Sequence, residues 1–364
     1  MPCFEINKSK IFPTILIKMI GLPNFIWQLN QLTQGVGRVR IKESMMLSLS
    51  LILPPLKEQK IIVKKTKDIE TEESDLKQEI AQQQTLLKKL RQQILQEAIE
   101  GKLTQDWRKK NPNTEPASEL LKRIQAEKQQ LIKDKKIKAQ KTLPVISENE
   151  KPFKLPKSWA WCRLGEVVEK YEAGKSFKCI NREIDNSEWG VIKTSAITSA
   201  FFKQMEHKYY QKHTPIDASK QIKNGDLIFC RASGTKGYAG KCCLVVGSVK
   251  NLLLSDKTPR LTFSCLIEKK YIYFHNESKH TVEYYFSLNT GKSTSMNNIT
   301  KDQLFENFLP LPPPAEQKAI VAKVEKLLNI CDKLQTQITA NQTYAEQLMQ
   351  AVLKAAFTQA EQPI

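Results

Sequence analysis

Apolar residues recur every seven positions through the stretch 54–101, which predicts one long helix. One row holds Ile62, Ile69, Leu76, Gln83 and Leu90, and a second row holds Thr66, Glu73, Ile80, Leu87 and Ile94. A hydrophobic period of 3.5 over five heptads is typical of a coiled coil. Pro54 and Pro55 suit only a helix start, and Gly101 suits its end. At 1.5 Å per residue the helix would be about 65–70 Å long, too long for a globular core helix.

The same pattern returns near the C-terminus. The run Leu53–Lys60 is matched by Leu311–Lys318, an offset of 258 residues. Shifted by that offset, the two rows become Ile320, Leu327, Leu334, Asn341, Leu348 and Val324, Cys331, Ile338, Ala345, Val352. We therefore expect residues 311–364 to form a second helix that pairs antiparallel with the first, with Gln83 facing Asn341 in a buried polar layer. The alternative is two independent surface helices.

Between the two helices lie a connector and a mixed segment. Residues 102–150 are charged, and Thr114-Glu115-Pro116 predicts a capped helix start. The face of that helix would be formed by Leu120, Leu121, Ile124 and Leu131. The lysine-rich run 133–141 is either a solvated face or a DNA-binding patch.

Residues 151–310 alternate short apolar runs with turn residues, which favours an α+β domain. Strands are predicted at 190–192, 226–229, 243–246 and 271–274, and a helix near 282–288. Residues 1–52 are expected to be an apolar strand-and-turn segment. Their apolar patch is interrupted by Pro13, Lys18 and Pro23, which argues against a membrane span.

The net charge of the chain narrows the classes of molecule that it could bind. The formal net charge is +19 and the pI is about 9.4, which favours a polyanion such as nucleic acid or an anionic membrane surface. The alternative is a merely basic soluble protein. Because the helices are duplicated, we expect a target molecule with two recognised parts, and DNA is the commonest target of this kind. The eight cysteines form no Cys-x-x-Cys pair, so a reduced, cytoplasmic protein is expected.

Catalytic motifs are not evident. Three Gly-Lys dipeptides lack the upstream glycine of a phosphate-binding loop, because positions 169, 235 and 286 are Glu, Thr and Phe. The four histidines lack metal-ligand spacing, and a faint carboxylate–lysine pattern at 215–217 and 268–270 is expected by chance in a Lys-rich chain. We therefore expect a non-catalytic protein.

Several ordered motifs together resemble the specificity subunits of type I restriction-modification enzymes. They are the Pro-Pro-x-x-Glu-Gln helix starts at 54–59 and 312–317, the segment 100–108, the opening 151–165 with Trp159-Ala160-Trp161, Gly225-Asp226-Leu227-Ile228, and Gly291 with Asn297-Asn298-Ile299. They extend over nearly the whole chain and are more specific together than any one of them.

The resemblance implies a target-recognition domain that reads one half of a bipartite site in double-stranded DNA, and conserved helices that act as a spacer. It also implies methyltransferase subunits, which bind S-adenosylmethionine, and motor–nuclease subunits, which use ATP and Mg²⁺. This chain itself would hold no cofactor and no metal, and would not bind a membrane.

On this basis the chain divides into five segments. Residues 1–52 would be the C-terminal remnant of a first recognition domain, 53–101 the central spacer helix, 102–150 a charged helical connector, 151–310 a complete recognition domain and 311–364 the C-terminal spacer helix. Since the complete domain opens near Leu155, its counterpart would begin about a hundred residues before Met1. We therefore expect an N-terminally truncated subunit, either from a rearranged gene or one that self-associates to replace the absent half.

DNA contacts are expected in three polar loops of the recognition domain, 175–178, 231–238 and 292–298, because phosphates attract Lys, Arg and hydroxyl groups while base edges attract Arg, Asn, Gln and Ser. The candidates in these loops are Lys175, Lys178, Arg231, Ser233, Thr235, Lys236, Tyr238, Lys292, Ser293, Asn297 and Asn298. Arg182 and Arg260 are secondary candidates outside the loops. The loop 231–238 ranks first, because Gly234 and Gly237 let the backbone approach a phosphate. The alternative for each residue is a solvated loop position.

Two other functions stay open beside DNA recognition. The chain could be a defective or decoy subunit that assembles with methyltransferase without directing modification. It could also be a coiled-coil scaffold with no role on DNA. Methyltransferase capture together with site-specific DNA binding would distinguish the three.

Overall fold

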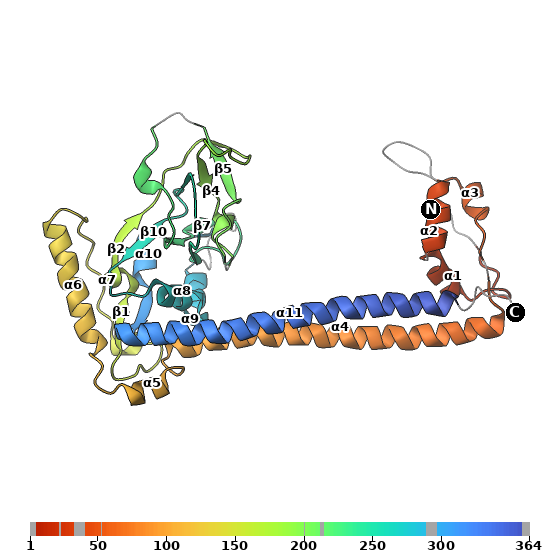
Figure 1. Ribbon diagram of the computed structural model, residues 1–364, viewed down its shortest axis with the longest axis horizontal. Coiled ribbons are helices and arrows are strands. Elements are labelled where there is room, and N and C mark those ends of the chain that lie inside the picture. Colours follow the sequence, from red (N-terminus) through yellow and green to blue (C-terminus); the bar gives the residue numbers. More distant parts are fainter. Residues whose placement is uncertain are drawn as a thin grey trace. The chain divides into compact units, whose positions relative to one another are not determined.

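Two compact units make up the chain, and the two long helices contribute to both. The computed structural model describes residues 5–21, 23–32, 41–51, 53–199, 201–211, 215–288 and 297–358. The first unit comprises Met1–Leu87 with Asp332–Ile364, and the second comprises Lys88–Cys331. Helix α4 (Leu56–Ile99) begins in the first unit and ends in the second, whereas α11 (Pro314–Thr358) does the reverse (Figure 1). The two helices are therefore antiparallel, as predicted.

Helices are the regular secondary structure found among the described residues of the first unit. Helices α1 (Pro13–Ile20), α2 (Pro23–Gln31) and α3 (Glu43–Leu47) precede α4. The strand-and-turn prediction for residues 1–52 was wrong, because two prolines begin helices, where their missing N–H leaves no hydrogen bond unmade. Apolar side chains of α1 pack on the start of α4 in a cluster of Ile11, Ile15, Met19 and Ile62.

The two predicted heptad rows differ in burial. In the row that begins with Thr66, the first-unit residues Thr66, Ile80, Leu87 and Ile338 and the second-unit residues Ile94, Val324 and Cys331 are buried. In the row that contains Gln83 and Asn341, Ile62 and Ile320 are buried near the helix starts, but Leu76, Leu90, Leu334 and Leu348 are exposed. The predicted buried Gln83–Asn341 layer was wrong, because neither residue is buried. Gln83 Nε2 donates to Glu79 Oε1 one turn away at 3.3 Å, and Asn341 is exposed.

The second unit begins with the connector. After Gly101, whose φ is +74°, come α5 (Gln105–Lys110) and α6 (Ala117–Lys133). Leu120 and Ile124 of α6 are fully buried, as the apolar face predicted. Helix α6 begins after Pro116 without a side-chain cap, so the predicted capping role of Thr114 was wrong. Thr114 instead donates its hydroxyl to Asn111 O at 2.8 Å.

Two four-stranded sheets form the body of the second unit. One has the order β2-β10-β6-β8 and is antiparallel; the other has the order β3-β5-β4-β9, in which β4 and β9 are parallel. The strands of the first sheet are β2 (Val168–Glu172), β6 (Leu227–Phe229), β8 (Cys242–Leu244) and β10 (Arg260–Phe263). Those of the second are β3 (Cys179–Ile180), β4 (Gly190–Ile192), β5 (His207–Tyr210) and β9 (Leu252–Leu253). One core cluster joins the sheets, with Ile192 from β4, Ile228 from β6, Cys243 from β8 and Leu252 from β9.

Two short ladders and four further helices belong to this unit. Strand β1 (Ala160–Arg163) pairs antiparallel with β12 (Phe308–Leu311), and β7 (Ala232–Ser233) pairs with β11 (Asn297–Asn298). Helix α7 (Leu164–Val167) follows β1 and packs against α10 (Lys301–Glu306). Helices α8 (Lys269–Glu277) and α9 (Lys279–Ser287) follow β10.

The strand predicted at 271–274 was wrong, because these residues lie in α8. Glu268 caps this helix by accepting from Lys270 N at 3.4 Å, and the buried side chains Tyr271, Phe274 and His275 recur at helical spacing. The predicted strands at 190–192, 226–229 and 243–246 and the helix near 282–288 agree with β4, β6, β8 and α9 within three residues at each end. Among the described residues, no helix combines the length and apolarity needed to cross a membrane.

Candidate nucleic-acid interface

The β7–β11 ladder joins two of the three loops that were predicted to contact DNA. Asn297 lies opposite Ser233 and Asn298 opposite Ala232, and Ile299 N donates to Arg231 O at 2.9 Å. These segments are more than sixty residues apart in the chain. The structure therefore gathers Arg231, Ser233, Asn297 and Asn298 at one place. Lys292 and Ser293, the other candidates of this loop, lie outside the described residues.

An exposed turn follows β7. The buried Ser233 side chain fixes it, since Ser233 Oγ accepts from Thr235 N at 3.1 Å, and Tyr238 N donates to Thr235 O at 3.3 Å. Gly237 has φ +80°, a conformation that favours glycine, and a Cβ placed there would meet no atom within 4 Å. Thr235 and Lys236 are exposed. The turn thus offers a hydroxyl, an ammonium group and uncrowded backbone to solvent.

Two hydrogen bonds fix the position of the Arg231 side chain. Its Nε donates to Asp256 O at 3.3 Å and its Nη1 to Asn298 Oδ1 at 3.4 Å, and both acceptors are neutral. The charge acts on its surroundings: burial raises the pKa of Tyr171, and the positive charge of Arg231 opposes that rise. An oriented, half-buried guanidinium of this kind suits a phosphate or the acceptor edge of a base.

Two aromatic side chains lie beside lysines near the β7–β11 ladder. Lys236 Nζ lies 5.0 Å from the ring centroid of Phe286, an exposed residue of α9, and Lys241 Nζ lies 5.8 Å from that of Tyr238. Phe286 and Lys241 were not predicted from the sequence. The signal for Phe286 is the i, i+4 pair Val282 and Phe286, which is exposed on α9 while Thr281 and Tyr285 are buried.

The third predicted loop belongs to the other sheet. Lys175 and Lys178 are exposed just before β3. Arg182 is engaged within its own loop: its guanidinium donates twice to Glu188 at 2.7 Å and lies 3.7 Å from the ring centroid of Tyr209. The hydrogen bonds from Arg182 lower the pKa of Glu188 to about 2, so this pair stays ionised at neutral pH. Arg182 is therefore less available to DNA than the two lysines.

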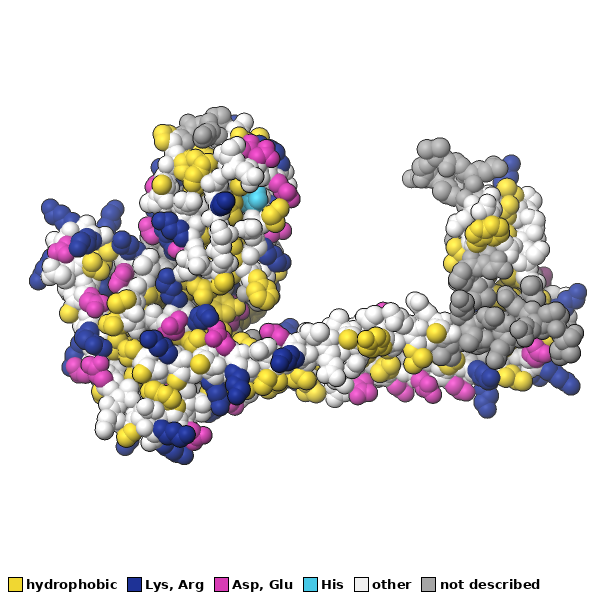
Figure 2. Space-filling model, in the orientation of Figure 1, with side chains coloured by type: hydrophobic (Ala, Val, Ile, Leu, Met, Phe, Trp, Pro, Cys, Tyr) yellow, Lys and Arg dark blue, Asp and Glu magenta, His cyan; other side chains and the backbone are white. Residues whose placement is uncertain are grey.

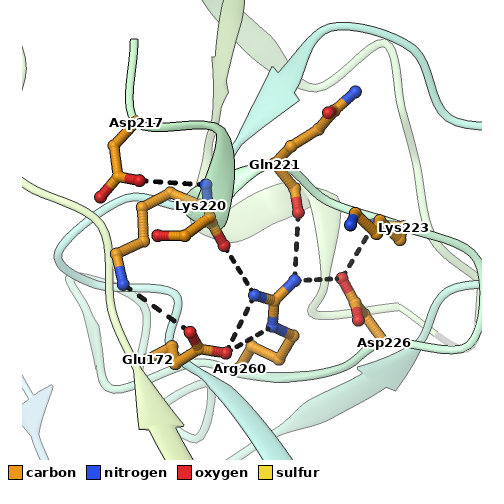
Figure 3. A network of polar contacts seen from close by, with 8 residues as sticks. Glu172, Asp217, Lys220, Gln221, Lys223, Asp226 and Arg260 are labelled. Carbon is orange, nitrogen blue, oxygen red and sulfur yellow. Dashed lines mark hydrogen bonds and ion pairs between the residues drawn. The ribbon is translucent and has the colours of Figure 1, made fainter.

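Arg260 has a structural role that removes it from the candidate interface. Its guanidinium donates to Glu172 Oε2 at 2.9 Å, to Asp226 Oδ2 at 2.8 Å, and to the carbonyls of Gln221 and Ser219 at 3.0 and 2.8 Å (Figure 3). Burial alone would lower its pKa, but Asp226 and Glu172 more than offset that effect. Each nitrogen of this side chain is used inside the domain. Arg260 thus ties β10 to β2 and to the turn before β6.

The carboxylates of the faint nuclease-like pattern also have structural partners. Asp217 accepts from Ser219 N at 3.0 Å, and Glu268 caps α8. Within the described ranges, no group of three or more His, Cys, Asp or Glu could hold a metal ion.

Comparison with known proteins places this geometry in a family. Residues 156–341 match the family model of the type I restriction modification DNA specificity domain, which is about half of the chain. The EcoEI specificity subunit of Escherichia coli is 37% identical over 269 residues, and the EcoAI specificity subunit is 32% identical over 274 residues. Each match covers 73% of this chain but 44% of the relative, so the chain spans less than half the length of these relatives.

Solved structures agree with that placement. A chain determined in work on complex assembly and conformational transition of the type I R-M system aligns over 96% of this chain and 72% of its own length. The identity is 18% and the TM-score is 0.58, which shows a shared fold. The family model over residues 156–341 decides the assignment. The chain belongs to the family of proteins that carry the type I restriction modification DNA specificity domain.

Proposed function

We propose that this chain recognises DNA sequence for a type I restriction-modification complex and has no catalytic role of its own. The observation that carries the proposal is the surface beside the β7–β11 ladder, which lies within the segment matching the DNA specificity domain. It combines the charged Arg231, the amides of Asn297 and Asn298, and the exposed turn with Lys236. Amides and guanidinium groups are the side chains that read base edges, and lysines attract phosphates.

We assign phosphate contacts to Lys236, Thr235 and the backbone of the turn, and base contacts to Arg231 and Asn298. The assignment rests on how firmly each side chain is held. Hydrogen bonds to Asn298 and Asp256 orient Arg231, whereas Lys236 is exposed in the turn. Lys175 and Lys178 would add phosphate contacts from the other sheet. The formal charge of +19 would draw DNA to the chain over a distance set by the ionic strength.

The long helices would receive the methyltransferase and motor–nuclease subunits. In each unit the exposed heptad row leaves leucines on the surface: Leu76 and Leu348 in the first unit, and Leu90 in the second. A row of exposed leucines along a helix is typical of a surface that another helix covers. S-adenosylmethionine, ATP and Mg²⁺ would then be bound by the partner subunits. The seven described cysteines are free thiols, which suits a reducing cytoplasm.

Genome-wide mapping of methylated adenines tests this function. Cells that express the chain should show methylation at a sequence motif that disappears when the gene is deleted. Arg231→Ala and Lys236→Ala together should abolish or relax that motif. A matched control, Lys109→Ala with Lys110→Ala, removes the same charge from exposed positions of the connector and should leave the motif unchanged. Capture of methyltransferase with an unchanged methylation map would instead identify a decoy subunit.

A further inference from the structure

Positive charge is concentrated where helix α6 ends, in residues 133–141, which we call the α6 tip. The α6 tip contains five lysines and one aspartate, which gives it a net charge of +4. All five lysines are exposed: Lys133, Lys135, Lys136, Lys138 and Lys141. Lys and Arg side chains gather around this end of the helix, at the left of the view in Figure 2.

The basic residues along α6 form ion pairs, whereas most of those in the α6 tip do not. The pairs along the helix are Lys122 with Glu119 at 2.8 Å and Arg123 with Glu115 at 2.9 Å. In the α6 tip, Lys136 is paired with Asp134 at 3.3 Å. The other four tip lysines form no ion pair with any residue that the structure describes. Their charge is therefore directed to solvent or to a partner.

The dipole of α6 accounts for only part of this charge. The carbonyl end of a helix favours nearby cations, but the effect falls off within the last turn. Helix α6 ends at Lys133, whereas Lys138 and Lys141 lie five and eight residues further along the chain. Stabilisation of the helix therefore does not explain the lysines at the far end of the α6 tip.

Backbone hydrogen bonds fix the conformation of the turn that follows the helix. Lys135 N donates to Ile132 O at 3.0 Å. Lys136 N donates to Leu131 O at 2.9 Å, which completes a Schellman motif. Lys135 has φ +57°, a left-handed conformation in which glycine is usual because it has no Cβ. A lysine kept at an exposed position that suits glycine points to a role for its side chain.

The α6 tip is attached to the recognition domain beside β2. Ile137 is buried. Gln140 Nε2 donates to Val168 O, at the start of β2, at 3.0 Å, and Gln140 Oε1 accepts from Lys128 Nζ at 3.3 Å. Strand β2 is an edge strand of its sheet, whereas β7 follows β6, on the other side of β10. The α6 tip is therefore an ordered surface separate from the β7–β11 ladder.

The chemistry of the α6 tip suits the phosphate backbone of a nucleic acid. A helix that lies on a membrane surface needs an exposed apolar face. Here Leu120, Ile124 and Ile137 are buried. The α6 tip contains no Arg or Asn, and its one glutamine is bound within the domain, so it lacks the side chains that most often read base edges. Lysines contact phosphates whatever the sequence.

We propose, building on the proposed function, that the α6 tip holds the phosphate backbone of duplex DNA outside the base pairs that lie on the β7–β11 surface. Lys135, Lys138 and Lys141 would contact phosphates on this flanking DNA. The contact would add affinity but no sequence specificity, because every sequence has the same phosphates. It would also fix the direction in which the duplex leaves the recognition domain.

The salt dependence of DNA binding by the full chain carrying Lys138→Gln and Lys141→Gln tests this proposal. On a mixed-sequence duplex of about 40 base pairs, roughly four turns, the slope of log K against log salt concentration should become shallower by up to about 1.8, because each lost phosphate contact removes about 0.9. On a duplex of about 12 base pairs, roughly one turn, the slope should not change, because flanking DNA is absent. The matched control, Lys109→Gln with Lys110→Gln, removes the same charge from exposed positions of α5 and should change neither slope.

Lys135→Gly separates a role on DNA from a role in the turn. Glycine fits the left-handed conformation, so this change should not lower the melting temperature of the chain. It should still reduce the salt slope on the long duplex by about 0.9. A melting temperature that changes while the slope does not would show that Lys135 serves only the turn, and would remove it from the proposed contact.

Two results would overturn the proposal. The first is a slope on the long duplex that equals that of the control variant; if binding to phosphatidylserine vesicles were lost at the same time, the α6 tip would be assigned to a membrane instead. The second is an equal reduction of the slope on both duplexes, which would place the α6 tip on the same base pairs as the ladder. Arg231→Ala with Lys236→Ala tests the proposed function separately, because those residues lie at the ladder and not in the α6 tip.

Discussion

Replacing Glu316 with alanine should destabilise the second unit far more than replacing its counterpart Glu58 destabilises the first. The carboxylate of Glu316 is fully buried and accepts hydrogen bonds from Thr104, Arg108 and Trp159. Removing one partner of a buried ion pair costs about 3–5 kcal/mol. The Arg108 side chain is 21% exposed and also donates to Gly101 O at 2.6 Å, so the lower end, about 3 kcal/mol, is expected.

Urea denaturation followed by far-ultraviolet circular dichroism measures this cost. Both units contain helices, so the signal reports on Glu316 and on Glu58 alike. Glu58→Ala changes the same residue type at an exposed position and should shift the free energy of unfolding by less than about 0.5 kcal/mol. Combining Glu316→Ala with Arg108→Ala should cost less than the sum of the single changes, by about 0.5–3 kcal/mol. Equal effects of Glu58→Ala and Glu316→Ala would refute the contrast between the two copies.

Three further predictions concern packing, pH and the ion-pair network. Leu87→Ala should lower the free energy of unfolding by about 2–5 kcal/mol, whereas Leu86→Ala at the adjacent exposed position should change it little. Thermal unfolding followed by circular dichroism distinguishes the buried position from the exposed one. Burial lowers the pKa of His275 from 6.5 to about 3, so as the pH falls the unfolded state binds this proton before the folded state does. The free energy of unfolding should therefore fall by up to about 1.4 kcal/mol per pH unit as the pH drops from 6.5 toward 3. In denaturation experiments at different pH values, His275→Gln should flatten that dependence. Arg260→Ala should cost about 3 kcal/mol, because Asp226 loses its cation and Glu172 keeps only Lys220 at 3.9 Å, yet it should leave the salt dependence of DNA binding unchanged. A weaker salt dependence would return Arg260 to the interface.

The sequence predicted where the two long helices lie in the chain, but not which of their faces would be buried. The heptad rows and the Pro-Pro starts are local signals, and both helices form where they predict. Which row is buried depends on what each helix packs against, and that information is not local. For this reason Gln83 and Asn341 were misplaced in a buried layer.

Local signals also misled at the N-terminus and in α8. Prolines that interrupt an apolar run suggest turns, but Pro13 and Pro23 each begin a helix. The run 271–274 alternates aromatic and aliphatic residues like a strand, but the cap at Glu268 and the burial of Tyr271, Phe274 and His275 are those of a helix. Tertiary packing decided both cases.

At the candidate interface, loop composition identified residue types but not their neighbours. Arg231 and Asn298 were both selected, yet their contact arises from pairing of β7 with β11, which no local pattern reveals. Arg260 was selected for its charge, whereas its acidic partners Glu172 and Asp226 lie 88 and 34 residues away in the chain. Long-range ion pairs of this kind are not visible in composition.

The salt dependence of binding to duplex DNA tests the central claim most directly. Each lost phosphate contact reduces the slope of log K against log salt concentration by about 0.9. The full chain carrying Arg231→Ala and Lys236→Ala should bind duplex DNA more weakly than the unaltered chain and with a slope shallower by about 1, because Lys236 is the phosphate contact of the two. The control Lys109→Ala with Lys110→Ala should leave the slope unchanged. An unchanged slope for the Arg231 and Lys236 variant would contradict the assignment of the β7–β11 surface to DNA.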